Sequence, residues 1–250
     1  MINQPAPGSA SLFMKENTAL TIGRQSSGEE VIVNLADLPN LFISYSNEVQ
    51  LPEIFSSLIK TICLSHSTTQ FALSFGSKLA RLLHPLLPKE MLLLHFTHGI
   101  YDAAKINSME EFIGALMLEF KRRKTLAKYS KRTTASYPGL VVFIDDIFEV
   151  IMSPQKKTSL SFIELLITGS TVHIYFIMGS AGIYRNILNQ LINVTPALQH
   201  KLKKSVQAYS VNHPLGAELV MNPDGLLFFR ERDEKIHRRL YPVGEKYRVV

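Results

Sequence analysis

The sequence feature that most constrains the fold is a series of five short, continuous apolar runs separated by longer helical patterns. The runs are residues 40–44, 70–75, 91–96, 140–144 and 172–178. Continuous apolar runs of this length predict strands that are covered on both faces, as in parallel sheets. Strands that alternate with helices indicate an α/β domain with a mainly parallel central sheet flanked by helices.

Between and after these runs, apolar residues recur at three- and four-residue steps and predict helices over residues 52–63, 109–120, 161–167 and 184–192. Pro52 suits the first turn of the first helix, and Ser108 with Glu111 resembles a capping box at the start of the second. The end of the chain differs, because residues 218–229 and 236–243 look like strands around a charged turn. We therefore expect a C-terminal addition resembling a β-hairpin.

Length and composition narrow the class of protein. The chain has 250 residues, of which 46% are hydrophobic, so a fully disordered chain is excluded. We expect a flexible leader over residues 1–15 and a single domain over residues 16–250.

One cysteine excludes a disulfide framework, and we expect no metal site. Without an apolar run of about 18 residues, we expect no integral membrane segment and a cytoplasmic location.

The apolar run at residues 140–144 ends in two acids, Asp145 and Asp146. This is the Walker B pattern of P-loop NTPases, in which the first acid holds magnesium and the second polarises the attacking water. In open α/β sheets, ligands bind at the carboxyl ends of the strands, where these acids would lie. The alternative is that the two acids simply begin a loop that faces solvent.

A phosphate-binding loop normally reads G-x-x-x-x-G-K-[ST], but this sequence contains no Gly-Lys pair. By position, the corresponding loop follows the first strand, and it contains neither glycine nor lysine. Its candidate nucleotide-binding residues are Tyr45, Ser46, Asn47, Glu48, Gln50, Leu51 and Pro52. The residues predict an NTPase-like frame with a degenerate phosphate loop. We therefore expect no cofactor, with Mg-ATP as the ligand if the site is functional.

These motifs belong to a longer pattern that resembles the FtsK/SpoIIIE (HerA/FtsK-type) family of P-loop DNA translocases. The resemblance covers roughly residues 20–230. Residues 119–126 resemble the family's E-M-E-R-R-Y helix, residues 141–152 its Walker B strand, residues 173–181 its sensor strand and residues 224–229 a late strand. In the segment before the phosphate loop, seven residues are in register with the family: Gly23, Ser27, Gly28, Glu29, Leu35, Ala36 and Pro39.

The resemblance implies a RecA-like P-loop NTPase fold, with Asp145 at the magnesium aspartate and Asp146 at the catalytic acid. It also places Leu51 at the phosphate-binding lysine, Pro52 at the magnesium-binding Ser/Thr and Gly179 at the sensor glutamine. The departures from the family are concentrated at the nucleotide site. That distribution implies that the fold persists while hydrolysis has been lost.

The net charge of +6 is concentrated in residues 121–132, which hold seven bases and no acid. The candidate DNA-binding residues are Lys121, Arg122, Arg123, Lys124 and Lys128, because clustered cations neutralise the phosphate backbone. The alternative is a solvated helix end, where the helix dipole favours cations.

The leading hypothesis is an FtsK-like pseudo-ATPase that acts as a binding or assembly component of a DNA mobilisation, translocation or secretion machine. Two alternatives stay open: an active, divergent ATP-dependent DNA translocase, and a purely structural ring subunit. The expected partners are DNA, an active FtsK/TraD-like motor, or further copies of the chain in a homo-hexamer.

Overall fold

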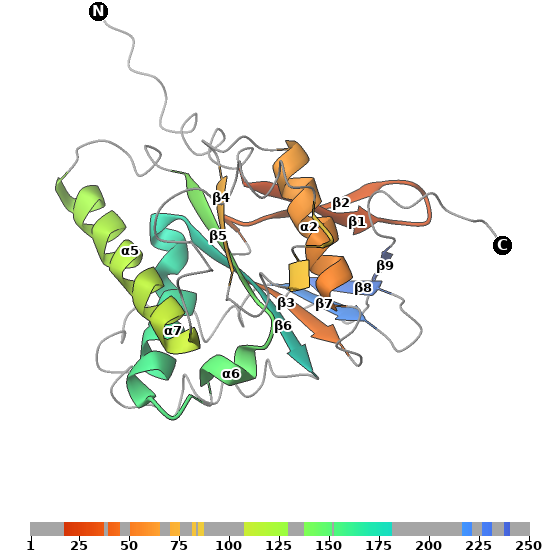
Figure 1. Ribbon diagram of the computed structural model, residues 1–250. Helices are drawn as coiled ribbons and strands as arrows, with labels where there is room; N and C mark the ends of the chain where they lie inside the picture. Colours follow the sequence, from red (N-terminus) through yellow and green to blue (C-terminus); the bar gives the residue numbers. More distant parts are fainter. Residues whose placement is uncertain are drawn as a thin grey trace, which may run out of the picture.

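The computed structural model describes residues 18–37, 40–45, 51–65, 71–75, 82–83, 85–87, 108–129, 138–151, 153–181, 217–221, 227–231 and 238–240. A seven-stranded sheet, in the order β4–β5–β6–β3–β7–β8–β9, forms the centre of these residues (Figure 1). Its strands are β3 (Asn40–Tyr45), β4 (Phe71–Phe75), β5 (Gly139–Ile144), β6 (Ile174–Ala181), β7 (Ala217–Met221), β8 (Leu227–Glu231) and β9 (Arg238–Leu240).

The first five strands in that order (β4, β5, β6, β3 and β7) are paired in parallel. The last two, β8 and β9, add to the edge of the sheet in antiparallel orientation. This confirms the α/β class, the mainly parallel sheet and the C-terminal antiparallel addition. The expected strand at residues 91–96, the expected helix at residues 184–192 and the leader at residues 1–15 lie outside the described residues.

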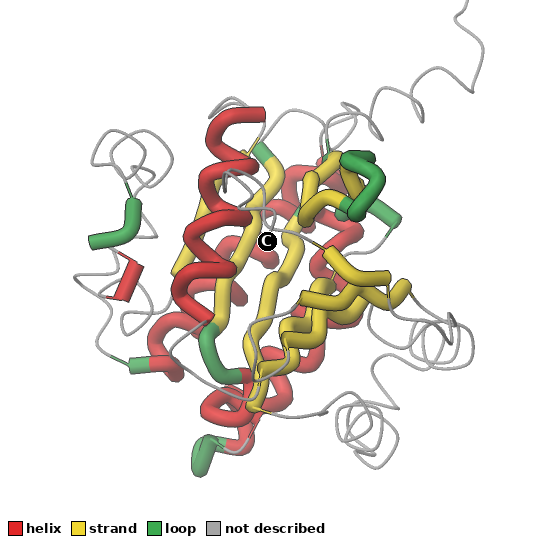
Figure 2. Tube along the Cα trace, turned by 90° about the vertical axis from the view of Figure 1, so that its right-hand side faces the viewer, coloured by secondary structure: helices red, strands yellow, loops and turns green. Residues whose placement is uncertain are grey.

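Helices cover both faces of the sheet. One face is covered by α2 (Leu51–Ser65) and by a hairpin of β1 (Ala19–Arg24) and β2 (Glu30–Asn34). The other is covered by α5 (Met109–Tyr129), α6 (Ile147–Ile151) and α7 (Lys156–Thr168), with the 3₁₀ turn η3 (Gly169–Val172) leading into β6. Figure 2, turned by 90°, shows helices in front of and behind the strands.

Successive side chains of a strand point to opposite faces, so each buried strand contributes to two cores. On β3, Ile43 and Tyr45 pack with α2, whereas Phe42 packs with the layer of α5 and α7. On β5, Phe143 joins the α2 side and Ile144 the opposite side. The continuous apolar runs in the sequence are explained by this burial on both faces.

Several boundaries differ from the sequence-based expectations. The β1–β2 hairpin lies in the segment before β3, where no strands were predicted, and α6 was not predicted either. The strand expected at residues 172–178 begins at Ile174, because residues 169–172 form the 3₁₀ turn and His173 adopts a left-handed backbone conformation with φ of 57°. The expected helix cap is present, since the backbone N–H of Glu111 donates to Ser108 Oγ at 3.1 Å.

None of the helices in the described ranges combines the length and the hydrophobicity that a bilayer span requires.

Candidate functional site

Three neighbouring parallel strands, β3, β6 and β5, end at the same edge of the sheet. Tyr45 is the last residue of β3, and Asp145 directly follows β5. Between them, Gly179 of β6 is paired with Ile43, and Met178 is paired with Ile144. The structure thus brings Tyr45, Asp145 and Gly179 together at the place where the sequence predicted a nucleotide site.

The side chain of Leu51, the first residue of α2, lies directly on the backbone of Gly179. A Cβ atom added to Gly179 would lie 2.7 Å from Leu51 Cδ2 and 2.4 Å from the Asp145 carbonyl oxygen. Real Cβ atoms essentially never come within 3.0 Å of a heavy atom outside their own residue and its two chain neighbours. Leu51 can therefore occupy this position because residue 179 is glycine.

Leu51 and Tyr45 are both part of the hydrophobic core, in the cluster that includes Phe55 of α2. Leu51 is only 4% exposed and Tyr45 only 5%. The hydroxyl of Tyr45 lies 3.5 Å from the Asp145 carbonyl oxygen, which it reaches as a long hydrogen-bond donor. An apolar contact between α2 and the strand ends thus lies beside the backbone of Asp145, a residue that is itself buried.

The two acids of the Walker B pattern have different surroundings. Asp145 is buried, whereas Asp146 is half-buried and begins the turn into α6. The backbone N–H of Phe148 donates to Asp146 Oδ1 at 2.8 Å, which satisfies one of the N–H groups at the start of that helix. Asp146, the residue aligned with the catalytic acid, thus uses one carboxylate oxygen to cap a helix.

The described residues do not fit the phosphate groups of a nucleotide. The position aligned with the phosphate-binding lysine is Leu51, which is buried among apolar side chains. The position aligned with the sensor, Gly179, carries no side chain and has no room for one. Pro52 has no hydroxyl that could bind magnesium. The remaining candidates, Ser46, Asn47, Glu48 and Gln50, lie outside the described residues, and none of them is basic.

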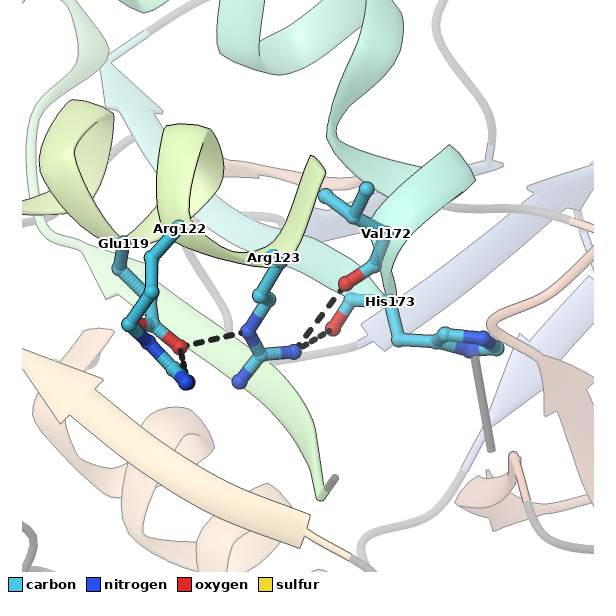
Figure 3. A network of polar contacts seen from close by, with 5 residues as sticks. All are labelled: Glu119, Arg122, Arg123, Val172 and His173. Carbon is cyan, nitrogen blue, oxygen red and sulfur yellow. Dashed lines mark hydrogen bonds and ion pairs between the residues drawn. The ribbon is translucent and has the colours of Figure 1, made fainter. Parts of the chain in front are cut away.

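A second group of polar residues joins α5 to the start of β6 (Figure 3). The buried carboxylate of Glu119 accepts a hydrogen bond from Arg123 Nε at 2.7 Å and two from Arg122, at 2.6 and 2.7 Å. Arg123 Nη1 donates to the backbone carbonyl oxygens of Val172 and His173, each at 3.1 Å. Arg123 thereby binds carbonyl groups of the 3₁₀ turn and of the bend before β6.

This network perturbs the nearby titratable groups. Burial raises the pKa of Glu119, but the hydrogen bonds and charges of Arg122 and Arg123 outweigh it, so the pKa is lowered overall. Burial lowers the pKa of His173, and the positive charge of Arg123 lowers it further. Burial raises the pKa of Tyr175 to about 12, against a smaller opposing effect of Arg123. His173 and Tyr175 are joined by a 3.1 Å contact from Nδ1 to the hydroxyl.

The five candidate DNA-binding residues all lie on α5, but they are not equivalent. Lys121, Arg122, Lys124 and Lys128 are exposed, whereas Arg123 is only 3% exposed and its guanidinium is bound inside the protein. The geometry thus gives Arg123 a structural role, while DNA contact by the other four stays a prediction. Sequence reasoning missed the Glu119 network, although an acid followed by arginines three and four residues later is a recognisable helical pairing pattern.

Comparison with solved structures identifies the fold as that of RecA-like P-loop ATPase domains. The cytoplasmic domain of the type VII secretion ATPase EccC from Thermomonospora curvata superposes with a TM-score of 0.59 at 15% identity, over 90% of this chain and 26% of that one. EssC (ATPases 2 and 3) from Geobacillus thermodenitrificans gives 0.57 at 14% identity, over 92% of this chain and 46% of that one. The pCW3 conjugation coupling protein TcpA gives 0.53 at 10% identity, over 90% of this chain and 66% of that one.

This chain therefore spans about a quarter of the EccC domain and less than half of the EssC fragment. No family model and no curated protein matches its sequence. At these identities the likeness shows the fold, and it agrees with the fold that the sequence motifs implied.

Proposed function

We propose that this chain is an FtsK-like pseudo-ATPase: a motor fold that does not hydrolyse nucleotide and acts as a binding or assembly component of a secretion or DNA mobilisation machine. The observation that carries the proposal is the contact of Leu51 with the backbone of Gly179. A P-loop needs a lysine and converging backbone N–H groups around the phosphates. Here an apolar side chain is buried at the lysine position.

The charge balance of the site points in the same direction. Asp145 supplies a buried acid, and the sequence of the loop adds Glu48 without any basic residue. A polyphosphate in such surroundings would meet negative charge that no lysine of the loop offsets, and like charges at close range are costly. The type of machine is suggested by the similar structures, which include a type VII secretion ATPase and a conjugation coupling protein.

Two measurements on the full chain test whether nucleotide binds and is hydrolysed. We expect no change in melting temperature with millimolar Mg-ATP and no phosphate release above background. Nucleotide at 100 times its dissociation constant would stabilise the fold by about 2.7 kcal/mol. For a chain of this size, that free energy would raise the melting temperature by roughly 5–10 °C.

The variant Asp145→Asn should leave both measurements unchanged, as should the control Asp37→Asn at an exposed position. Turnover that Asp145→Asn abolishes and Asp37→Asn preserves would refute the proposal and show that the chain is an active ATPase. Assembly is tested separately by the native mass of the chain, alone and mixed with an active motor of the same fold.

A further inference from the structure

The outward face of α5 carries an unusual set of exposed apolar side chains. Leu118 is 69% exposed, Tyr129 is 76% exposed and Leu126 is 42% exposed. A single exposed leucine is ordinary on a protein surface, but here three large apolar residues lie within three turns of one helix. The opposite face of α5 already supplies the core through Phe112, Leu116 and Phe120, so among the described residues core packing does not explain the outer set.

The spacing along α5 places two of these residues, Leu118 and Tyr129, on one stripe. Leu118, Arg122, Thr125 and Tyr129 are separated by four, three and four residues, which brings them to the same side of a helix. We call this stripe, with Leu126 beside it, the α5 seam. Leu118 and Tyr129 are about 16 Å apart along the helix axis, the length of about three turns of a second helix.

The charges around the α5 seam are positive. Lys121, Lys124 and Lys128 are exposed along the same turns of α5. Between Leu118 and Tyr129 the sequence contains one acid, Glu119, which is only 3% exposed and is bound by two arginines on the buried side. A partner with carboxylates beside its own apolar stripe would therefore be complementary in both charge and hydrophobicity.

The α5 seam is also held in place. The buried Arg123 joins the helix to the carbonyl oxygens of Val172 and His173, and the bonds of Glu119 to Arg122 fix that side chain. A surface that is already ordered loses less conformational entropy when a partner binds.

We propose that the α5 seam docks an acidic amphipathic helix of a partner protein. Apolar side chains of that helix pack on Leu118 and Tyr129, and its carboxylates pair with Lys121 and Lys128. Nucleic acid would use the lysines but not the exposed leucines, and therefore the apolar part of the seam favours a protein partner. The inference goes beyond the pseudo-ATPase proposal and does not depend on whether nucleotide binds.

The test uses the full chain and a fluorescent designed peptide of about 20 residues, long enough to form a helix on binding. The peptide carries leucines spaced by four, three and four residues with glutamates on both flanks, and a scrambled peptide of the same composition is the control. In anisotropy titrations we expect the amphipathic peptide to bind, Leu118→Ala and Tyr129→Ala each to weaken binding about tenfold, and Lys121→Glu with Lys128→Glu to do the same. The effect of the charge change should diminish at high salt.

Matched controls come from other exposed positions. Leu64→Ala changes a leucine of α2 that is 78% exposed, on the other side of the sheet, and Lys156→Glu with Lys157→Glu changes two exposed lysines of α7. These variants should bind like the unchanged chain. All of the variants alter exposed side chains, so melting curves should confirm that they fold.

Three results would overturn the proposal. If the scrambled peptide binds equally well, or neither peptide binds, the seam does not recognise an acidic helix. If duplex DNA binds more tightly than the peptide, and the lysine variants abolish that binding while Leu118→Ala and Tyr129→Ala do not, the surface is a nucleic-acid site. If the chain self-associates and Leu118→Asp reduces its native mass to that of one chain, the occupant is a second copy.

Discussion

Replacing Gly179 with alanine adds one methyl group where β6 meets Leu51 and the backbone of Asp145. That methyl carbon would lie 2.4 Å from the Asp145 carbonyl oxygen and 2.7 Å from Leu51 Cδ2. Carbon atoms pack best at about 3.5–4.0 Å, so Leu51 would have to move by roughly an ångström. The carbonyl belongs to the backbone at the end of β5 and cannot rotate away.

Inserting a methyl group into a packed interior costs about 1–3 kcal/mol, and the backbone clash places Gly179→Ala near the upper value. We therefore expect the melting temperature to fall by roughly 5–10 °C, from the usual 2–4 °C per kcal/mol for a chain of this size. The control is Gly114→Ala on the exposed side of α5, where an added Cβ meets nothing within 4 Å. At that position, helix propensity predicts that alanine raises the free energy of unfolding by about 0.5–1 kcal/mol.

Both substitutions restrict the unfolded chain in the same way, so the difference between the two variants reports their effects on the folded state, which are the clash at position 179 and the helix propensity at position 114. A double-mutant cycle with Leu51→Ala then separates the two close contacts. In the Leu51→Ala background, Gly179→Ala should cost about 1 kcal/mol less, because the contact with Cδ2 is gone and the contact with the carbonyl persists. Differential scanning calorimetry measures all four proteins. Equal and favourable shifts for Gly179→Ala and Gly114→Ala would refute the argument.

Three further predictions concern the buried polar and thiol groups. Arg123→Met removes the buried ion-pair partner of Glu119 and both hydrogen bonds to the carbonyl oxygens of Val172 and His173, so it should cost about 3–5 kcal/mol in urea unfolding. Arg122→Met removes a half-exposed arginine and should cost less, because Arg123 still pairs with Glu119. The lowered pKa of His173 means that the unfolded chain takes up the proton first. Stability should therefore fall as the pH drops below about 6.5, and His173→Asn should reduce this dependence of the melting temperature on pH. Burial raises the pKa of Cys63 to about 12, so iodoacetamide at pH 8 should alkylate the folded chain far more slowly than the urea-unfolded chain.

Each of these three predictions can fail on a single measurement. If Arg123→Met and Arg122→Met lose the same free energy of unfolding, the burial of Arg123 does not contribute to stability. If the melting temperature of His173→Asn falls with decreasing pH as much as that of the unchanged chain, groups other than His173 cause the loss of stability in acid. Equal alkylation rates in water and in urea would show that the thiol of Cys63 is accessible in the folded chain.

The sequence was sufficient to predict the parallel sheet because the runs at β3 and β5 are mostly apolar and show no polar–apolar alternation, a pattern that burial on both faces produces. It did not predict the β1–β2 hairpin, because Gly28 at the turn (φ of 87°) is an isolated signal and because the exposed Ile32 between the buried Val31 and Val33 hides the alternation of β2. The site was predicted by position, but the contact between Leu51 and Gly179 joins residues 128 apart and has no local signature.

For the basic segment, pattern reasoning could count the cations but could not say which of them were buried. Arg123 and Lys124 are neighbours in the sequence, yet one is bound inside the protein and the other is exposed. That difference depends on where the carbonyl groups of Val172 and His173 lie, which is a property of the tertiary structure.

The contact between Leu51 and Gly179 also bears on how this sequence can change over evolutionary time. A larger residue at position 179 is obstructed while Leu51 is present, and a lysine at position 51 would bring a charged group into the apolar cluster that Leu51 now fills. Each single step toward a phosphate-binding arrangement therefore passes through a less stable protein. Leu51 and Gly179 should therefore be epistatic: the free-energy cost of changing either residue depends on which residue stands at the other position.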